Sequence, residues 1–278
     1  MSRRFSGKVV IVTGASSPAG IGAAAARQFA AEGAAVAVIA RGAEGLEEVA
    51  REIRGRGGEA RAFPADLTDV AACERLIQDV VGAYGGLDVL VNNAGANTRG
   101  PVERHDARAL AGVIEINLIA PIVLTRLALP SLRARGGGSV VQVASIAGQI
   151  PLAEEATYSA SKFGLRAFSF ALRDELEGSN IRVSVVSPGP VDTGFLLQDL
   201  DHVPDVIFAQ PMSTAEEVAA LVVESALDGR RERTIPVQTG ILARVGAAVP
   251  ALRRVLLPAM EKRGRAAKEV FRARHGRG

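Results

Sequence analysis

Short apolar runs rich in β-branched residues alternate with longer stretches of helical periodicity from the N-terminus to about residue 238. The short runs predict strands, and the longer stretches predict the helices between them. Strands this apolar, joined by helix-length crossovers, favour a parallel sheet covered by helices on both faces. The expected strands are 8–12, 35–39, a short one ending near residue 66, 88–91, 139–143, 182–186 and 234–237, and the expected helices are 20–31, 43–54, 69–84, 106–135, 158–176 and 214–227, the last with Ser213 and Glu216 as a capping box.

The alternation runs without an internal repeat or a linker, which predicts one α/β domain over residues 1–240. A helical extension follows over 241–278, with ten Lys or Arg and two Asp or Glu, a net charge of +8 in a chain of +3, so the first 240 residues carry −5. Its apolar and basic residues recur at helical spacing and are interrupted by two prolines. These residues are Leu242, Val245, Val249, Leu252, Val255, Leu256 and Met260, with Arg244, Arg253, Arg254 and Lys262, and with Pro250 and Pro258 as breaks.

Three roles remain open for this extension. It could form a docked helix pair whose basic end, beyond Gly264, is solvated and frayed. It could lie on an anionic membrane surface or pack on a partner subunit. It could also cover a hydrophobic substrate channel.

Composition excludes several other classes of protein. Hydrophobic residues make up 48% and charged residues 23% of the 278 positions, as in an ordinary globular protein with a large core. The single cysteine, Cys73, cannot form an internal disulfide, and we interpret it as a helix packing residue and not a reactive thiol. We expect no metal site, no nucleic-acid partner, no signal peptide and no membrane-spanning helix, and therefore a cytoplasmic protein.

A glycine-rich loop joins the first expected strand to the first expected helix. Glycines allow the backbone to turn sharply and approach a pyrophosphate, while the helix N-terminus offers free N–H groups and the positive end of the helix dipole. A plain turn is the alternative, but strand, loop and helix occur in the order that phosphate binding requires. The predicted phosphate-binding residues are Gly14, Ser16, Ser17, Gly20, Ile21 and Gly22.

The ends of the second and third strands bear on the choice of cofactor. An acidic residue after the second strand would bind the ribose hydroxyls of NAD, but here Ala40 is followed by Arg41, which favours the 2′-phosphate of NADP. A solvated arginine is the alternative. After the third strand, Asp66 and Leu67 could contact the adenine, and Asp66 could also be the N-cap of the next helix.

Small and polar residues also follow the later strands. Asn93, Ala94 and Gly95 follow the fourth strand and leave room for the adenosine and ribose against the backbone, and Ser145 follows the fifth. Asn117 lies within a long apolar helix, where an asparagine gains little unless its amide has a partner. A rigid turn suited to holding a carboxamide follows the sixth strand, with Pro188, Gly189, Val191 and Thr193 as its candidate contacts.

Tyr158 and Lys162 are one helical turn apart, so both side chains leave the same face of their helix. A fixed cation near a phenol stabilises the phenolate and lowers the phenol's pKa from about 10. A tyrosine in such a setting can donate and accept protons. The pair alone is also typical of an ordinary amphipathic helix.

Taken in order and spacing, these motifs resemble those of the short-chain dehydrogenase/reductase family over residues 7–238. The resemblance implies a Rossmann-like, doubly wound parallel sheet of about seven strands, a nicotinamide dinucleotide, and a homodimer or homotetramer built on the helices of Asn117 and Tyr158. It implies that Tyr158 exchanges a proton with the substrate oxygen, which Ser145 fixes. Lys162 would bind the nicotinamide ribose and lower the pKa of Tyr158, and Asn117 would hold a relay water.

The glycine loop departs from the family pattern, because Pro18 and Ala19 form an insertion of two residues before Gly20. NADP-dependent relatives often carry a basic residue where this chain has Ala19. We expect Ser16 or Ser17 to bind the 2′-phosphate in its place.

An apolar stretch between Thr193 and Pro211 is typical of a lid over a nonpolar ligand. Residues 150–152 would add to the same wall. The alternative is that the apolar side chains of this segment pack against the core. They are Phe195, Leu196, Leu197, Val206, Ile207 and Phe208.

The sequence therefore predicts an NADP(H)-dependent oxidoreductase that interconverts a carbonyl and a secondary alcohol on a small, apolar substrate, with NAD(H) as the second choice of cofactor. An NAD-dependent hydroxysteroid-type dehydrogenase is one alternative. A dinucleotide-binding sensor or scaffold without activity is the other.

Overall fold

A seven-stranded parallel sheet forms the centre of the molecule, in a computed structural model that describes residues 3–275 except the side chains of residues 250 and 252–254. The strand order is β3-β2-β1-β4-β5-β6-β7. The winding direction reverses between β1 and β4, and ligands of such sheets bind there, outside the carboxyl ends of the strands. The predicted Rossmann-like architecture is confirmed. The strands are β1 (Val9–Thr13), β2 (Ala35–Ala40), β3 (Glu59–Pro64), β4 (Val89–Asn92), β5 (Gly138–Val143), β6 (Ile181–Pro188) and β7 (Glu232–Ile235).

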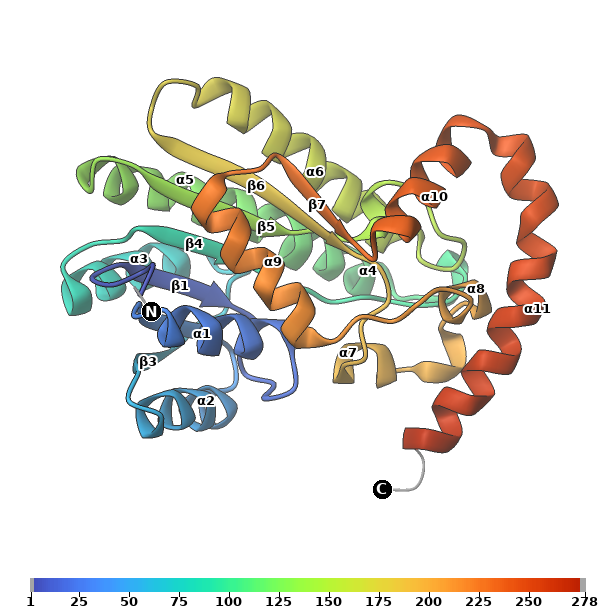
Figure 1. The fold of residues 1–278 in the computed structure, drawn as a ribbon, viewed down its shortest axis with the longest axis horizontal. Coiled ribbons are helices and arrows are strands. Elements are labelled where there is room, and N and C mark those ends of the chain that lie inside the picture. The colour runs from blue at the N-terminus through green and yellow to red at the C-terminus, as the bar shows by residue number, and fades with distance from the viewer. Residues whose placement is uncertain (1–2, 276–278) are drawn as a thin grey trace.

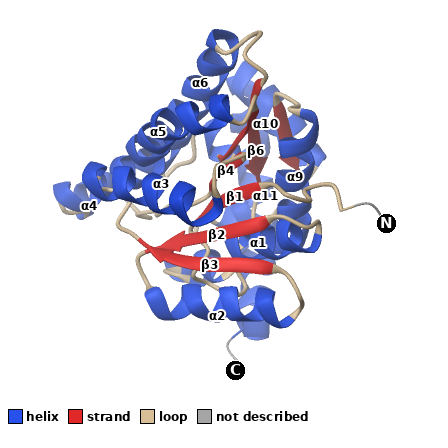
Figure 2. Cartoon of the chain, turned by 90° about the vertical axis from the view of Figure 1, so that its left-hand side faces the viewer, coloured by secondary structure: helices blue, strands red, loops and turns tan. Residues whose placement is uncertain are grey.

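Helices cover both faces of the sheet (Figures 1 and 2). On one face, α1 (Ile21–Ala31), α2 (Ala43–Gly55) and α9 (Ala215–Asp228) bury a core that includes Phe29, Leu46 and Val222. On the other face, α3 (Val70–Tyr84), α5 (Ala120–Ala134) and α6 (Ala156–Glu175) bury a second core that includes Leu90 and Leu124. The remaining helices are α4 (Ala107–Ile114), α7 (Gly194–Leu197), α8 (Asp205–Phe208), α10 (Val237–Ala248) and α11 (Pro250–His275), with short turns at Val102–Arg104, Glu115–Ile119, Ile146–Gly148 and Leu200–His202.

The predicted starts of α3 and α9 agree with the structure within one residue, but the residues proposed to cap them were wrong. The capping box of α9 consists of Thr214 and Glu217, whose side chains bond each other's backbone N–H groups, and not of Ser213 and Glu216. The N-cap of α3 is Asp69, whose side chain accepts from the N–H of Ala71. In each case several polar residues in a row could cap, and the position where the chain enters the helix selects one of them.

Cys73 packs inside α3, as expected, with its side chain fully buried. Burial raises the pKa of its thiol to about 11. A thiol held in its neutral form is a poor nucleophile, which agrees with a packing role.

The helical run Ala107–Ala134 is long and apolar enough, by length and composition, to cross a membrane, contrary to the sequence expectation. This is weak evidence for a membrane span. The run also carries Asn117 in its middle and places Leu124, Ala128 and Leu132 in the core beneath the sheet.

Helix α11 corrects the prediction of a frayed, solvated C-terminal end. It continues through Pro258 to His275 and packs along α8 at the edge of the molecule (Figure 1). Beyond Gly264, Phe271 is buried against Phe208 with ring centroids 5.4 Å apart, and the ammonium of Lys268 donates to the carbonyls of Asp201 and Val203. The predicted apolar stripe is exposed along α10, at 39% for Leu242 and 40% for Val245, so its contact with a membrane or a partner stays a prediction.

Candidate active site

Three polar side chains meet at the carboxyl ends of β5 and β6. Tyr158 and Lys162 leave the first turns of α6, and the Lys162 Nζ lies 5.6 Å from the centroid of the Tyr158 ring. Ser145 follows β5 directly; its Oγ accepts from the N–H of Ala147 at 3.1 Å, and its hydroxyl also hydrogen-bonds the phenol of Tyr158. Tyr158 is half-buried and Lys162 is 4% exposed. The geometry therefore brings together a phenol, a hydroxyl and a buried ammonium.

The expected lowering of the Tyr158 pKa is not present in this state. Burial raises the pKa of Tyr158 well above its ordinary value of 10, and the nearby Glu155 carboxylate raises it further. The hydrogen bond with Ser145 and the charge of Arg99 oppose the rise but do not cancel it. Tyr158 is thus held as a neutral phenol, the form that can donate a proton.

Lys162 is the buried cation of the site. Its Nζ donates to the carbonyl of Val143 at 3.1 Å, and burial lowers its pKa from 10.5 to about 8. At pH 7, an ammonium with a pKa of about 8 is protonated in most molecules. Charge is therefore available beside Tyr158 below pH 8 and is lost above it.

Replacing Lys162 by Met should make the unfolding free energy of the cofactor-free protein less dependent on alkaline pH. The folded chain releases the Lys162 proton near pH 8 while the unfolded chain keeps it to about 10.5, so stability rises with pH in this window. The wild type should gain about 2 to 3 kcal/mol relative to Lys162→Met across the window, at about 1.4 kcal/mol per pKa unit.

Urea unfolding at pH 7, 8, 9 and 10 measures this difference. The exposed Lys262→Met is the matched control, and its curve should run parallel to that of the wild type. Parallel curves for Lys162→Met as well would contradict a depressed Lys162 pKa.

Asn117 lies in a single π-helical turn, Glu115–Ile119, between α4 and α5. Such turns displace a side chain from the regular helical register and are frequent at functional sites. The fully buried amide of Asn117 accepts from the N–H of Ala96 and donates to its carbonyl, both at 2.8 Å, and also donates to Ser161. It thereby fixes the loop after β4 against α6, while the relay water expected from the resemblance stays a prediction.

The glycine loop after β1 is shaped by close backbone contacts. Gly14 has a φ of +69°, and a Cβ at Gly22 would lie 2.4 Å from the carbonyl oxygen of Gly14. Asn93, after β4, donates from its amide to the carbonyls of Thr13 and Gly14. A Cβ at Gly95, in the loop after β4, would lie 3.7 Å from the Lys162 Nζ, and a Cβ at Gly14 would lie 2.8 Å from Ala94 of the same loop. The loop after β4 therefore joins the glycine loop to the catalytic candidates.

The two inserted residues, Pro18 and Ala19, form an exposed turn closed by the bond from Gly20 N–H to the Ser17 carbonyl. Arg27 of α1 donates to the Pro18 carbonyl at 2.8 Å. The insertion therefore bulges outward and leaves the packing of Gly14 on Gly22 intact. Gly20 is the N-cap of α1, and Ile21 and Gly22 open the helix as expected.

Arg41 and Asp66 are neighbours at the ends of β2 and β3. Arg41 is exposed, and its charge contributes to lowering the pKa of Asp66. The larger cause is Thr68, whose N–H and hydroxyl both donate to the Asp66 carboxylate. Asp66 is thus fixed in a local turn and does not cap α3, while Leu67 is buried.

The turn after β6 lies beside β7 and α10. The N–H of Gly189 donates to the carbonyl of Ile235 at 2.7 Å, and a Cβ at Gly189 would lie 3.4 Å from Thr239. Pro188, Val191 and Thr193 are buried. The turn is thus packed against β7 and α10, while its rigidity and its contacts with a carboxamide stay predictions.

The segment 193–211, here called the lid, divides into an inner half, residues 193–198, and an outer half, residues 199–211. In the inner half, Phe195 is 36% exposed and its ring centroid lies 6.2 Å from that of Tyr158. In the outer half, Phe208 is buried against α11. The prediction of an apolar wall thus describes the inner half, and the alternative, packing of the side chains, describes Leu196 and Phe208.

Two charged residues beside Tyr158 were not predicted from the sequence. Arg99 and Glu155 are 7% and 3% exposed and form an ion pair with a 3.3 Å separation. They are far apart in the sequence, and neither belongs to a motif. The only signal was an arginine after two polar residues and the second of two adjacent glutamates, and such residues are common in surface loops.

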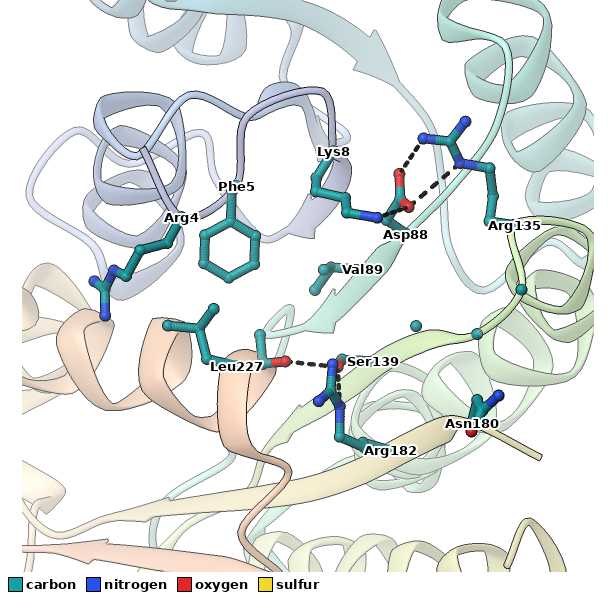
Figure 3. A pocket seen from close by; sticks show the side chains of 14 residues that line it. Arg4, Phe5, Lys8, Asp88, Val89, Arg135, Ser139, Asn180, Arg182 and Leu227 are labelled. Carbon is teal, nitrogen blue, oxygen red and sulfur yellow. Dashed lines mark hydrogen bonds and ion pairs between the residues drawn. The ribbon is translucent and has the colours of Figure 1, made fainter. Parts of the chain in front are cut away.

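A hollow of about 470 Å³ lies away from this site, at the opposite ends of the strands (Figure 3). Three of its four lining cations are already paired: Asp88 binds both Lys8 and Arg135, and Arg4 binds Glu32 and Glu224. Arg182 hydrogen-bonds Ser139 there. Neutralised charges make this hollow a poor candidate for catalysis. No cluster of three or more His, Cys, Asp or Glu side chains that could hold a metal lies within the described residues.

Comparisons with known proteins agree with the geometry. Residues 8–202 match the family model described as short chain dehydrogenase. The chain is 37% identical to the ketoacyl reductase HetN of Nostoc sp. over 222 residues, which cover 80% of this chain and 76% of that one. It is 40% identical over 194 residues to a cis-4-hydroxycyclohexanecarboxylate dehydrogenase of Sinomonas cyclohexanicum, covering 69% and 77%. A metagenomic short-chain oxidoreductase solved in complex with NADP aligns with a TM-score of 0.72 and 34% identity, over 84% of this chain and 98% of the other.

Proposed function

This chain belongs to the short-chain dehydrogenase/reductase family, and we propose that it uses NADP(H) to interconvert a carbonyl and a secondary alcohol on a lipophilic substrate. It is an oxidoreductase that acts on CH–OH groups, as its relatives are. The convergence of Tyr158, Ser145 and Lys162 beside the glycine loop carries the proposal.

A nicotinamide dinucleotide fits the residues at this edge of the sheet. Gly14, Gly22 and Gly95, here called the cradle, pack so closely on their neighbours that a Cβ at each would lie 2.8, 2.4 and 2.9 Å from another protein atom. Only glycine permits this close packing of the loops after β1 and β4, where we expect the backbone to approach a pyrophosphate or a ribose. The N-terminus of α1 points its free N–H groups at the same loop. When bound, the dinucleotide would supply or accept the hydride.

Three side chains would handle the proton and the substrate oxygen. Tyr158 would donate its phenolic proton to the carbonyl oxygen in reduction and recover it in oxidation. Ser145, already hydrogen-bonded to that phenol, would donate to the same substrate oxygen. The charge of Lys162 would stabilise the phenolate left after transfer, and Asn117 would hold the loop that borders Lys162.

The preference for NADP(H) is supported by the ends of β2 and β3. Ala40 offers no acceptor for ribose hydroxyls, and the Asp66 carboxylate is engaged by Thr68. Arg41 is the exposed cation at this edge. A solved relative of similar fold was crystallised with NADP, which agrees with the preference.

Arg41→Ala should raise the Kd for NADPH about tenfold or more, because a charge-assisted hydrogen bond contributes about 1.5 to 3 kcal/mol, and should leave the Kd for NADH within about twofold. Thermal unfolding against each cofactor measures both, since a ligand of the folded state raises stability. Arg51→Ala, an exposed arginine on α2, is the control. Equal affinities of the wild type for NADPH and NADH would instead favour the NAD-dependent hydroxysteroid-type alternative.

The proposal of a lipophilic substrate rests on the lid. The Phe195 ring faces Tyr158, and Leu197 is 37% exposed on the same short helix. The scaffold alternative has little support, because all the catalytic positions hold competent groups and the relatives are named as a reductase and a dehydrogenase. Members of this family are typically oligomeric, and we further propose that the exposed Ile119 and Phe163 lie in a contact between copies.

A further inference from the structure

A buried ion pair lies between the loop after β4 and the start of α6. Arg99 and Glu155 are 7% and 3% exposed, and the Nε of Arg99 lies 3.3 Å from the Glu155 Oε1. The backbone beside them is joined as well, because the N–H of Gly100 donates to the carbonyl of Glu154 at 2.8 Å. Burying two charges is unfavourable unless their remaining hydrogen-bonding groups are satisfied.

The other donors of Arg99 are directed at the lid. Nη1 donates to the carbonyl of Gln198, and Nη2 donates to the carbonyl of Phe195 at 3.1 Å. The guanidinium carbon also lies 5.4 Å from the centroid of the Phe195 ring. One planar side chain thus holds both ends of the short helix α7.

Glu155 connects this anchor to the catalytic helix. It is the N-cap residue of α6, which carries Tyr158 one turn later, yet its carboxylate makes no capping hydrogen bond and engages Arg99. The Phe195 ring centroid lies 5.4 Å from the Arg99 guanidinium carbon and 6.2 Å from the Tyr158 ring centroid. The lid and the helix that carries the Tyr158 phenol therefore both contact the Arg99–Glu155 ion pair.

We propose that Arg99, held by Glu155, is a positioning residue that fixes the inner half of the lid over Tyr158 and so sets the space left for the apolar part of the substrate. The proposal rests on the proposed function only in taking segment 193–211 as a substrate lid. Helix α11 holds the outer half of the lid through Lys268, which leaves Arg99 as the anchor of the half that faces the phenol.

Arginine suits this position and lysine does not. A guanidinium presents donors in a fixed fork, so it can bind a carboxylate and two carbonyls at once. An ammonium at residue 99 would still neutralise Glu155 but could not reproduce the fork. Arg99→Lys therefore keeps the buried charge paired, and with it the fold, while removing the lid bonds.

Limited cleavage by chymotrypsin tests the proposal without cofactor or substrate. The protease cuts after large apolar residues such as Phe195 and Leu197, and its rate follows the population of the open segment. Cleavage within 193–211 should be at least about tenfold faster in Arg99→Lys, and in the charge-free double variant Arg99→Gln with Glu155→Gln, than in the wild type, since each variant loses two charge-assisted bonds. The control Arg104→Gln removes an exposed arginine of the same loop and should match the wild type.

Kinetics give the second measurement. In Arg99→Lys, the KM for a long-chain methyl ketone should rise about tenfold or more, while the Kd for NADPH stays within about twofold. Wild-type lid protection together with an unchanged KM in Arg99→Lys would overturn the proposal. If the wild type reduces no ketone, the proposed function fails, and lid cleavage alone still decides the role of Arg99.

Discussion

Tyr158→Phe should lower kcat by two to four decades, the usual contribution of general acid–base catalysis. The variant loses only the phenolic oxygen, and the ring that packs at 6.2 Å from Phe195 remains. The lid and the cofactor cradle should therefore be unchanged, and the Kd for NADPH should stay within about twofold. Initial rates of NADPH oxidation with a saturating ketone, combined with thermal shifts on NADPH, measure both quantities.

The only other tyrosine of the chain supplies a matched control. Tyr84 donates its hydroxyl to the carbonyl of Val36 at 3.2 Å, on the face of the sheet that carries α3. Tyr84→Phe should cost about 1 kcal/mol of stability through this hydrogen bond and leave kcat unchanged. Turnover at the wild-type rate in Tyr158→Phe would remove the phenol from the reaction.

Gly22→Ala should weaken NADPH binding by about two decades or more. The added Cβ would lie 2.4 Å from the Gly14 carbonyl oxygen and 2.7 Å from the Asn93 amide nitrogen, so α1 must move away from the loop. That shift would also break the bonds from Asn93 that fix the loop, at an overpacking cost of about 1 to 3 kcal/mol in stability.

Titration of thermal stability with NADPH measures the effect, which should appear as a small or absent shift. Gly112→Ala is the control, because that glycine is also helical but a Cβ there meets nothing within 4 Å. A wild-type Kd for NADPH in Gly22→Ala would show that the cradle does not hold the pyrophosphate.

The sheet and the site could be predicted from sequence because both depend on local signals. Continuous runs of apolar, β-branched residues such as those of β1 and β5 indicate buried strands by themselves. Residues that follow parallel strands share one edge of the sheet, so Ser145 and Asn93 could be placed together. Exact helix starts were less certain because Asp66 and Asp69 are equally able to cap. The raised pKa of Tyr158 could not be foreseen, since it depends on burial and on Glu155, which no motif includes.

The burial of two residues of α11 could not be predicted from the sequence either. Lys268 and Phe271 gave no sequence signal, because a basic helix end is usually solvated. In the structure they are both 7% exposed, because the outer half of the lid supplies carbonyls for one and Phe208 for the other. Only the tertiary partner tells a buried lysine from a solvated one.

Helix α11 bears on two properties that usually change together in an enzyme, its choice of substrate and its reaction. The family match ends at residue 202, inside the lid, whereas the residues that hold the outer lid lie between 264 and 275. Under the proposed function, mutations in the last turns of the chain would alter which compounds enter without touching the groups proposed to transfer the proton. Natural selection, or a protein engineer, would thus have a region for diversifying substrate choice that leaves the reaction itself conserved.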